Sequence, residues 1–187
     1  AATMMASTHV GEVDHKSTRE VQRKSSFYVA IVMAFPSTVD LIPRLTEAES
    51  AQYTYVVLDT GCERMLAGML AHLAHVDRLK KRKLGVDCRD EIEQFAFGDN
   101  KIQSSCLRVT SPAAIIDDHH PHVVPFLMRY SVLKADVPFL ASKSFMRLSG
   151  AVLDMGNLVV SFPALGVVCK MVALSSGHIA VRMDNFP

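Results

Sequence analysis

The sequence has no tryptophan, little net charge and few cysteines. Twenty basic residues against nineteen acidic ones leave a formal net charge of +1, so the charge balance favours neither a nucleic-acid nor a membrane partner. The four cysteines (Cys62, Cys88, Cys106 and Cys169) form no CxxC or CxH pair, which argues against a zinc ribbon and against a dense disulfide framework. We therefore expect reduced thiols in a cytoplasmic, intracellular setting.

Long hydrophobic runs are also missing. The longest, residues 27–35, is far shorter than the ~20 residues that a membrane-spanning helix needs and is followed by Pro36. The N-terminus carries no secretory signal pattern. The chain opens Ala-Ala-Thr and stops at Pro187, so we expect a piece of a longer product. Its content of 49% hydrophobic residues predicts a globular core.

The chain divides into a polar start and one domain. Residues 1–25 are polar and predict a flexible N-terminal arm or linker, and residues 26–187 form the domain, with a core at about 53–183. Within it, residues 27–33 are rich in β-branched and aromatic side chains and predict a strand. Residues 53–58 predict a short buried strand that ends at Asp-Thr-Gly.

From Met65 to Lys81 the apolar residues recur at steps of three and four, at Leu66, Met69, Leu70, Leu73, Val76 and Leu79. This period predicts an amphipathic helix. The basic cluster at residues 80–83 then reads as a solvated helix end that complements the helix dipole, rather than as a nucleic-acid site.

Beyond Gly85 the pattern is that of β structure. Residues 95–97 and 102–109 predict a hairpin around the turn Gly98-Asp99-Asn100. Further short strands are predicted at 113–116, 123–132, 139–140, 151–153, 158–162 and 179–183. Many short strands with one helix predict a small, closed, mostly antiparallel barrel.

Asp59-Thr60-Gly61 suits acid–base work on a peptide bond. The preceding strand would hold the carboxylate rigidly, and Gly61 would let main-chain N–H groups approach it. Two such carboxylates a few ångströms apart share one proton, so that one can activate water while the other protonates the substrate. A phosphatase would need a second Asp at position 61, and a metal site lacks nearby ligands in sequence. An Asp that merely caps a turn stays open.

Four sequence blocks occur in one order between about residues 53 and 183. They are residues 57–62 with Ala67-Gly68, Phe95-Ala96-Phe97-Gly98-Asp99, residues 136–154 with Gly150-Ala151-Val152-Leu153-Asp154, and residues 174–181 with Ser176-Gly177-His178. Together they resemble the retropepsin-like aspartic protease domain of a copia-type retrotransposon polyprotein.

The resemblance implies a mostly β, retropepsin-like acid-protease barrel with one inserted amphipathic helix after the catalytic loop. Asp59 would be the catalytic carboxylate, Thr60 would clasp two catalytic loops together, and Gly61 would make the tight turn. The substrate-binding flap would be Phe97, Gly98, Asp99 and Asn100. The catalytic loop would be supported by Phe139, Leu140, Ala141 and Ser142.

The resemblance further implies an aspartic endopeptidase that processes a polyprotein by water-mediated hydrolysis, without metal or cofactor. Because the chain has only one Asp-Thr-Gly, we expect a homodimer with one Asp59 per protomer and an extended polypeptide substrate that pairs with sheet edges. Cys62, Ser142 and Asn100 depart from the family pattern, where small residues or Gly are common, although Asn tolerates the same backbone as Gly. Cys62 and Ser142 leave open the alternative of an inactive domain that serves as a dimerisation or protein-binding module.

Other polar residues receive simpler interpretations. His119-His120-Pro121-His122 is expected to be an exposed loop rather than a metal site, because adjacent residues usually point in different directions. His72 and His75 are expected on the surface of the helix. Cys62 is expected to be a small buried packing residue rather than a nucleophile, because the nearby Asp59 would raise the pKa of its thiol.

Overall fold

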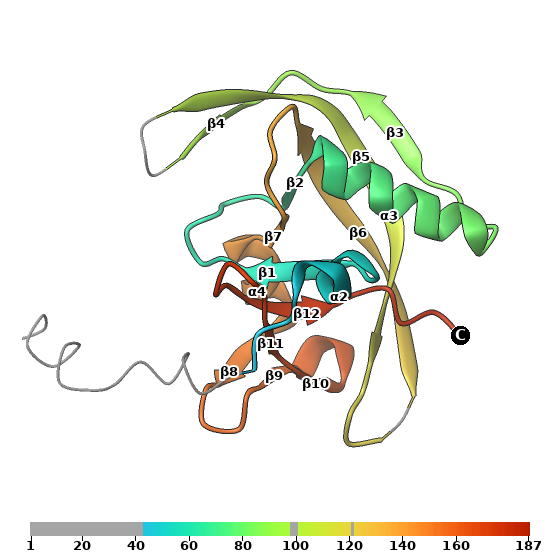
Figure 1. The fold of residues 1–187 in the computed structure, drawn as a ribbon, viewed down its shortest axis with the longest axis vertical. Coiled ribbons are helices and arrows are strands. Elements are labelled where there is room, and N and C mark those ends of the chain that lie inside the picture. The colour runs from blue at the N-terminus through green and yellow to red at the C-terminus, as the bar shows by residue number, and fades with distance from the viewer. Residues whose placement is uncertain (1–42, 98–100, 121) are drawn as a thin grey trace, which may run out of the picture. The chain divides into compact units, whose positions relative to one another are not determined.

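The computed structural model describes residues 43–97, 101–120 and 122–187. The arm predicted at 1–25, the strand at 27–33 and the turn Gly98-Asp99-Asn100 lie outside these residues. The described part is mostly β, as predicted (Figure 1). None of its helices is long and apolar enough to cross a membrane.

Within the described residues, three α-helices and one 3-10 helix accompany the strands. The helices are α2 (Glu47–Ala51), α3 (Met69–Lys81), α4 (Lys143–Ser149) and η2 (Pro163–Leu165). The strands are β1 (Tyr55–Leu58), β2 (Leu66–Gly68), β3 (Asp87–Asp90), β4 (Gln94–Ala96), β5 (Ile102–Ile116), β6 (Val123–Leu133), β7 (Phe139–Ala141), β8 (Val152–Asp154), β9 (Val159–Phe162), β10 (Val167–Lys170), β11 (Val172–Ala173) and β12 (Ile179–Arg182).

The described strands form two sheets. Nine strands make one sheet in the order β11-β12-β1-β7-β2-β6-β5-β3, with β4 pairing with β5, and β10-β9-β8 make a separate sheet. The path is open, so the expectation of a closed barrel is wrong for this part of the chain. At one edge, β3 has only exposed side chains, among them Asp87, Arg89 and Asp90, and charged edge strands resist further pairing.

The centre of the large sheet places β7 between β1 and β2. β7 runs parallel to β1, with Leu58 opposite Ala141, and antiparallel to β2, with Leu140 opposite Leu66. Val56 and Ala141 are fully buried, so these short strands are fixed by packing on all sides. The ends of β1 and β7, where Asp59 and Ser142 follow, therefore lie next to each other.

The helix predicted from Met65 begins four residues later. Residues 66–68 form β2 and pair in parallel with β6, because an apolar triplet that fits the helical period also fits a buried strand, and sheet pairing decides between them. The apolar face predicted for this helix is also wrong. Leu70 and Leu73 are 65% and 54% exposed, whereas its buried residues include His72 and His75, so the prediction of surface histidines is wrong. The basic helix end, residues 80–83, is exposed as predicted.

The β predictions after Gly85 are confirmed in type and differ in extent. Phe95 lies opposite Gln103 in the predicted hairpin. β5 and β6 are 15 and 11 residues long and pair along their length in a long ribbon. β5 joins the two segments predicted at 102–109 and 113–116, whereas β6 matches the predicted strand 123–132 to within one residue. The core beneath includes Met128, Tyr130 and Phe162.

Candidate active site

Asp59 follows the last residue of β1 and is held by main-chain contacts. Its N–H donates to the carbonyl of Ala141 at 3.4 Å, and the Gly61 N–H donates to Asp59 Oδ1 at 2.8 Å. A Cβ on Gly61 would stand 3.2 Å from that oxygen, tighter than most such contacts. The prediction that Gly61 brings a main-chain N–H to the carboxylate is therefore confirmed.

The same local bond occurs a second time in the chain. The Gly156 N–H donates to Asp154 Oδ1 at 2.9 Å, and both turns have the geometry of an Asx turn. The two sites differ in their support, because Asp154 ends the exposed strand β8 whereas Asp59 follows a strand with a buried centre. The hydrogen bond alone is therefore compatible with a simple turn cap. What distinguishes Asp59 from Asp154 is the buried strand that precedes it.

Thr60 and Gly61 are exposed at the tip of this loop. Within the part of the chain that the structure describes, the Thr60 hydroxyl makes no hydrogen bond. The role expected for Thr60, clasping a second catalytic loop, therefore stays a prediction.

The residue after the triplet, Cys62, is half-buried rather than buried as expected. Its Sγ donates to the carbonyl of Arg64 at 2.7 Å. Burial raises the pKa of the Cys62 thiol, and Asp59 and Glu63 raise it further. The thiol therefore stays protonated near neutral pH, as a packing residue does and a nucleophile does not.

The start of α4 fixes the far side of the loop. The Lys143 N–H donates to the carbonyl of Cys62 at 2.7 Å, and the Ser144 hydroxyl donates to the carbonyl of Glu63 at 3.1 Å. Lys143 Nζ lies 3.5 Å from Glu63 Oε1. These three contacts between residues 62–63 and residues 143–144 make the loop and α4 one unit.

Ser142, which departs from the family pattern, is the N-cap of α4. Its hydroxyl accepts the Phe145 N–H at 2.9 Å, as N-cap serines commonly do. Its φ of −78° and ψ of 157° lie in the ordinary extended region, so no glycine is needed here. The serine therefore closes a helix end and does not strain the Asp59 loop.

The other expected support residues lie directly behind the loop. Phe139 and Ala141 are buried and Leu140 is half-buried. The ring of Phe139 packs edge-on against Tyr130, with centroids 4.9 Å apart, and against His75 at 5.4 Å. β7 therefore couples the Asp59 loop to the aromatic core.

The stem of the expected flap is tied to the same region. Phe97 is half-buried and its N–H donates to the carbonyl of Lys101 at 3.1 Å, while Gly98, Asp99 and Asn100 lie outside the described residues. Arg64 forms an ion pair with Glu93, just before β4. The hairpin is thus anchored five residues after Asp59.

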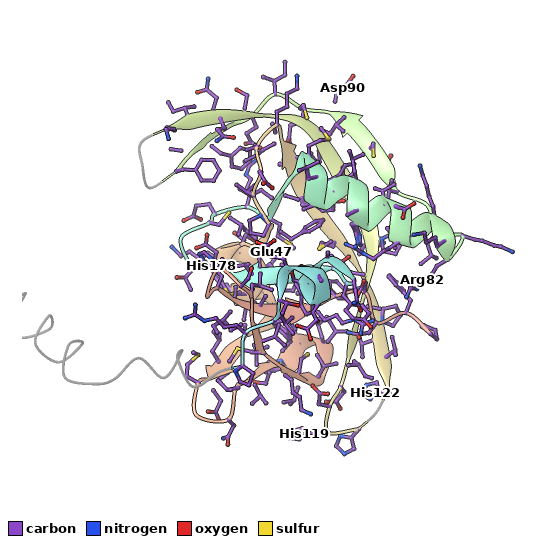
Figure 2. The ribbon with its side chains drawn as sticks, viewed as in Figure 1. Glu47, Arg82, Asp90, His119, His122 and His178 are labelled. Carbon is purple, nitrogen blue, oxygen red and sulfur yellow. The ribbon has the colours of Figure 1, made fainter. Side chains whose placement is uncertain are left out.

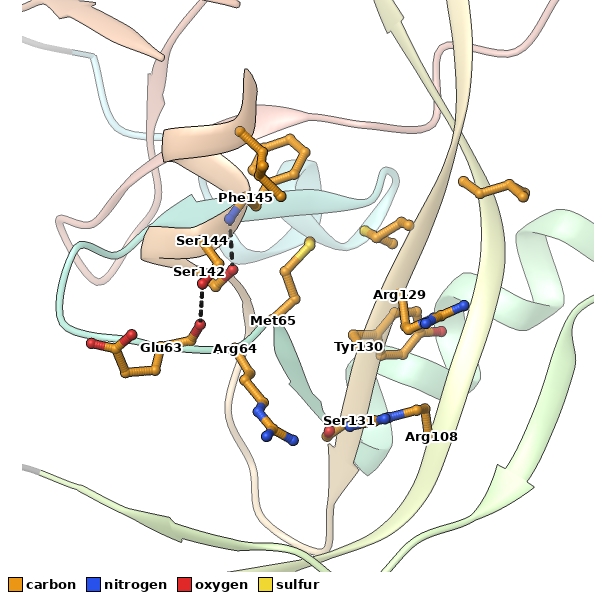
Figure 3. Close-up of a pocket in the computed structure, with 13 residues that line it drawn as sticks. Glu63, Arg64, Met65, Arg108, Arg129, Tyr130, Ser131, Ser142, Ser144 and Phe145 are labelled. Carbon is orange, nitrogen blue, oxygen red and sulfur yellow. Dashed lines mark hydrogen bonds between the residues drawn. The ribbon is translucent and has the colours of Figure 1, made fainter. Parts of the chain in front are cut away.

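A cavity of about 320 Å³ lies on the α4 side of this loop. Figure 3 shows Ser142 and Ser144 on one side of it and Arg64 and Arg108 on the other. Asp59 is not among its lining residues. The cavity is therefore a neighbour of the candidate site and not its reaction cleft.

The histidine loop behaves as expected for an exposed segment. Figure 2 shows His119 and His122 at the connection between β5 and β6, and both are exposed. The buried Asp117 accepts the N–H groups of Val168 at 3.0 Å and His120 at 3.1 Å, and these bonds lower the pKa of Asp117. In residues 43–97, 101–120 and 122–187 no group of three or more His, Cys, Asp or Glu side chains is placed to hold a metal ion.

Sequence reasoning missed one functional candidate, the polar cluster around the fully buried His75. Its ring lies 2.9 Å from Thr54 Oγ1 and 3.1 Å from Ser111 Oγ. The spacing of His72, His75 and Arg78 at steps of three was the available signal, because such residues share one helix face.

A scan against protein-family models finds no match to this chain. A search of the curated proteins likewise finds no significant relative.

Proposed function

We propose that this chain is a retropepsin-like aspartic endopeptidase that works as a homodimer with one Asp59 per protomer and processes a polyprotein. The observation that carries the proposal is the support of Asp59. β7 lies between β1 and β2 and holds Asp-Thr-Gly at the exposed end of a buried strand, with a main-chain N–H on the carboxylate. This is the arrangement that a rigid, solvent-reachable acid–base group needs.

The chemistry follows from pairing two such loops. Two Asp59 carboxylates on a two-fold axis would share one proton. The ionised one takes a proton from water as the water oxygen attacks the peptide carbonyl, and the protonated one gives its proton to the carbonyl oxygen. Proton transfer to the amide nitrogen then lets the C–N bond break. No other group has to supply charge or electrons.

A second copy also explains the exposed groups near the loop. Thr60 would find its partner in the Thr60 loop of the other protomer. Among the described strands, β8 pairs only with β9, and it carries Val152, 59% exposed, and Leu153, 40% exposed. In Figure 1 the loop that follows β1 lies toward the same side of the fold as β8. An open apolar edge on this side favours strand pairing between two copies.

Val152→Lys should weaken this dimer at least tenfold, because it places a charge on the apolar edge. The protomer should keep its stability, since the side chain is exposed. Sedimentation across a concentration series measures the shift. Ile92→Lys, at a position 92% exposed on the segment between β3 and β4, is the matched control and should sediment as wild type. Equal dimerisation of both variants would contradict the proposed interface.

The direct test of the activity is a peptidase assay on unfolded polypeptide with and without pepstatin. The proposal expects cleavage that pepstatin blocks and that rises more steeply than linearly with protein concentration when dimers are scarce. A protein that dimerises but neither cleaves nor binds pepstatin would be the non-catalytic dimerisation module, and the enzyme proposal would be wrong.

A further inference from the structure

A chain of buried polar side chains crosses the protein behind β1. We propose that it is a pH-sensitive lock in which neutral His75 positions the strand that carries Asp59. Its consequence for catalysis rests on the proposed protease function, whereas the lock itself is a property of the fold and is tested without activity.

His75 touches the elements on both sides of it. It projects from α3, and Nδ1 lies 2.9 Å from the hydroxyl of Thr54, the residue before β1. Nε2 lies 3.1 Å from the hydroxyl of Ser111 on β5, and the ring packs against Phe139 on β7. One imidazole therefore joins α3, β1, β5 and β7.

The hydrogen bonds around His75 have one direction. Arg78 Nε donates to Thr54 Oγ1 at 3.2 Å, and Arg has no acceptor. We assign the one hydroxyl proton of Thr54 to His75 Nδ1, so that Nε2–H donates to Ser111. The ring of Tyr130 packs against His75 with centroids 6.5 Å apart, and its phenol lies 3.0 Å from His72 Nδ1. In this arrangement each hydrogen bond of His75 uses one hydrogen, and the imidazole is neutral.

Asp184 anchors the other end of the lock. It is almost fully buried, and its carboxylate accepts the Thr54 N–H at 2.9 Å and Arg182 Nε at 2.8 Å. It also lies 3.5 Å from Arg78 Nε. Thr54, just before β1, is thus held through its hydroxyl by His75 and Arg78 and through its backbone N–H by Asp184.

The charged groups that face His75 come from two elements. Arg78 and His72 lie on α3, and Asp184 follows β12; Tyr130 on β6 and Ser111 on β5 are neutral. Burial, reinforced by Arg78 and opposed by Asp184, lowers the pKa of His75 to about 4. The imidazole of His75 is therefore neutral in the folded protein at pH values well above 4.

Protonation would break the direction of the chain. A second ring N–H would point at Thr54 Oγ1, and the threonine hydroxyl proton would lose its acceptor on the ring. Because the folded pKa lies below the usual 6.5, the stabilisation is complete above pH 6.5 and is lost as the pH falls toward about 4. Acid thus loosens the support of β1.

The test compares wild type, His75→Gln and the exposed control His119→Gln by urea unfolding between pH 7.5 and 4. As the pH falls below 6.5, the equilibrium constant for unfolding should rise more steeply in wild type and in His119→Gln than in His75→Gln. The extra rise should be up to about tenfold per pH unit. Amide exchange at Val56 and Val57, corrected for intrinsic rates, should show the same extra acid sensitivity. A His75→Gln profile parallel to wild type overturns the lock.

Imidazole NMR on the wild-type chain keeps the test independent of the variant's folding. The lock requires His75 to be neutral at pH 7 with its proton on Nε2, and the opposite tautomer or a charged ring overturns it. If cleavage is observed, the acid limb of kcat/KM should move to lower pH in His75→Gln. A lock without any cleavage would refute the protease proposal alone, and cleavage with an unmoved acid limb would refute the consequence of the lock for catalysis, while the unfolding and NMR results decide the lock itself.

Discussion

Asp59→Asn is expected to reduce peptide cleavage at least ~10³-fold while leaving the dimer intact, because an amide can neither take a proton from water nor return one. The fold should survive, since the amide oxygen of Asn can still accept the Gly61 N–H that now reaches Asp59 Oδ1 at 2.8 Å. Cleavage of a polypeptide substrate and sedimentation of the same sample measure the two outcomes together.

Asp154→Asn is the matched control for this prediction. Asp154 makes the same contact with the glycine two residues ahead, at 2.9 Å, and ends the exposed strand β8. Full activity in Asp154→Asn with loss in Asp59→Asn would separate catalysis from turn capping. Normal cleavage by Asp59→Asn would make Asp59 a turn cap.

Gly68→Ala is expected to destabilise the fold by more than ~3 kcal/mol, in the range reserved for severe core defects. Gly68 ends β2 and is the N-cap of α3. A Cβ there would lie 2.3 Å from the carbonyl oxygen of Ala135 and 2.6 Å from both N and O of Val137. These are backbone atoms that cannot rotate away, so β2 or the approach to β7 must shift.

Gly85→Ala provides the comparison for the glycine change itself. A Cβ at Gly85 meets nothing within 4 Å, so the substitution should change stability by less than ~1 kcal/mol and in the stabilising direction through the unfolded chain. Urea unfolding of both variants measures the difference. Equal stability of the two would show that the packing around Gly68 is looser than described.

The strands around the candidate site could be predicted from the sequence because local pattern and burial agree there. Val56 and Val57 form an apolar run in β1, and Phe139 starts another in β7. The placement of β7 between β1 and β2 could not be read from pattern, since pairing between residues 58 and 141 depends on the whole chain. That placement is what gives Asp59 its support.

The helix shows why the remaining predictions failed. Leucines at 70 and 73 fit an apolar face, but the sheet covers the face with His72 and His75 instead. Two histidines can be buried there because hydroxyls from Thr54, Ser111 and Tyr130 satisfy their ring nitrogens, which offsets the cost of burying them. These partners are distant in sequence from the helix, so the spacing of apolar residues along the helix cannot predict them.

The central claim is that two Asp59 residues from two protomers make one active site, and mixing tests it directly. Wild type and Asp59→Asn are combined in equal amounts at constant total protein and allowed to exchange protomers. If the site is shared and needs both carboxylates, random pairing leaves about one quarter of the dimers as wild type, and cleavage falls to about that fraction of the pure wild-type rate. A rate of about one half, linear in the wild-type fraction, would mean that each protomer works alone and would contradict the claim.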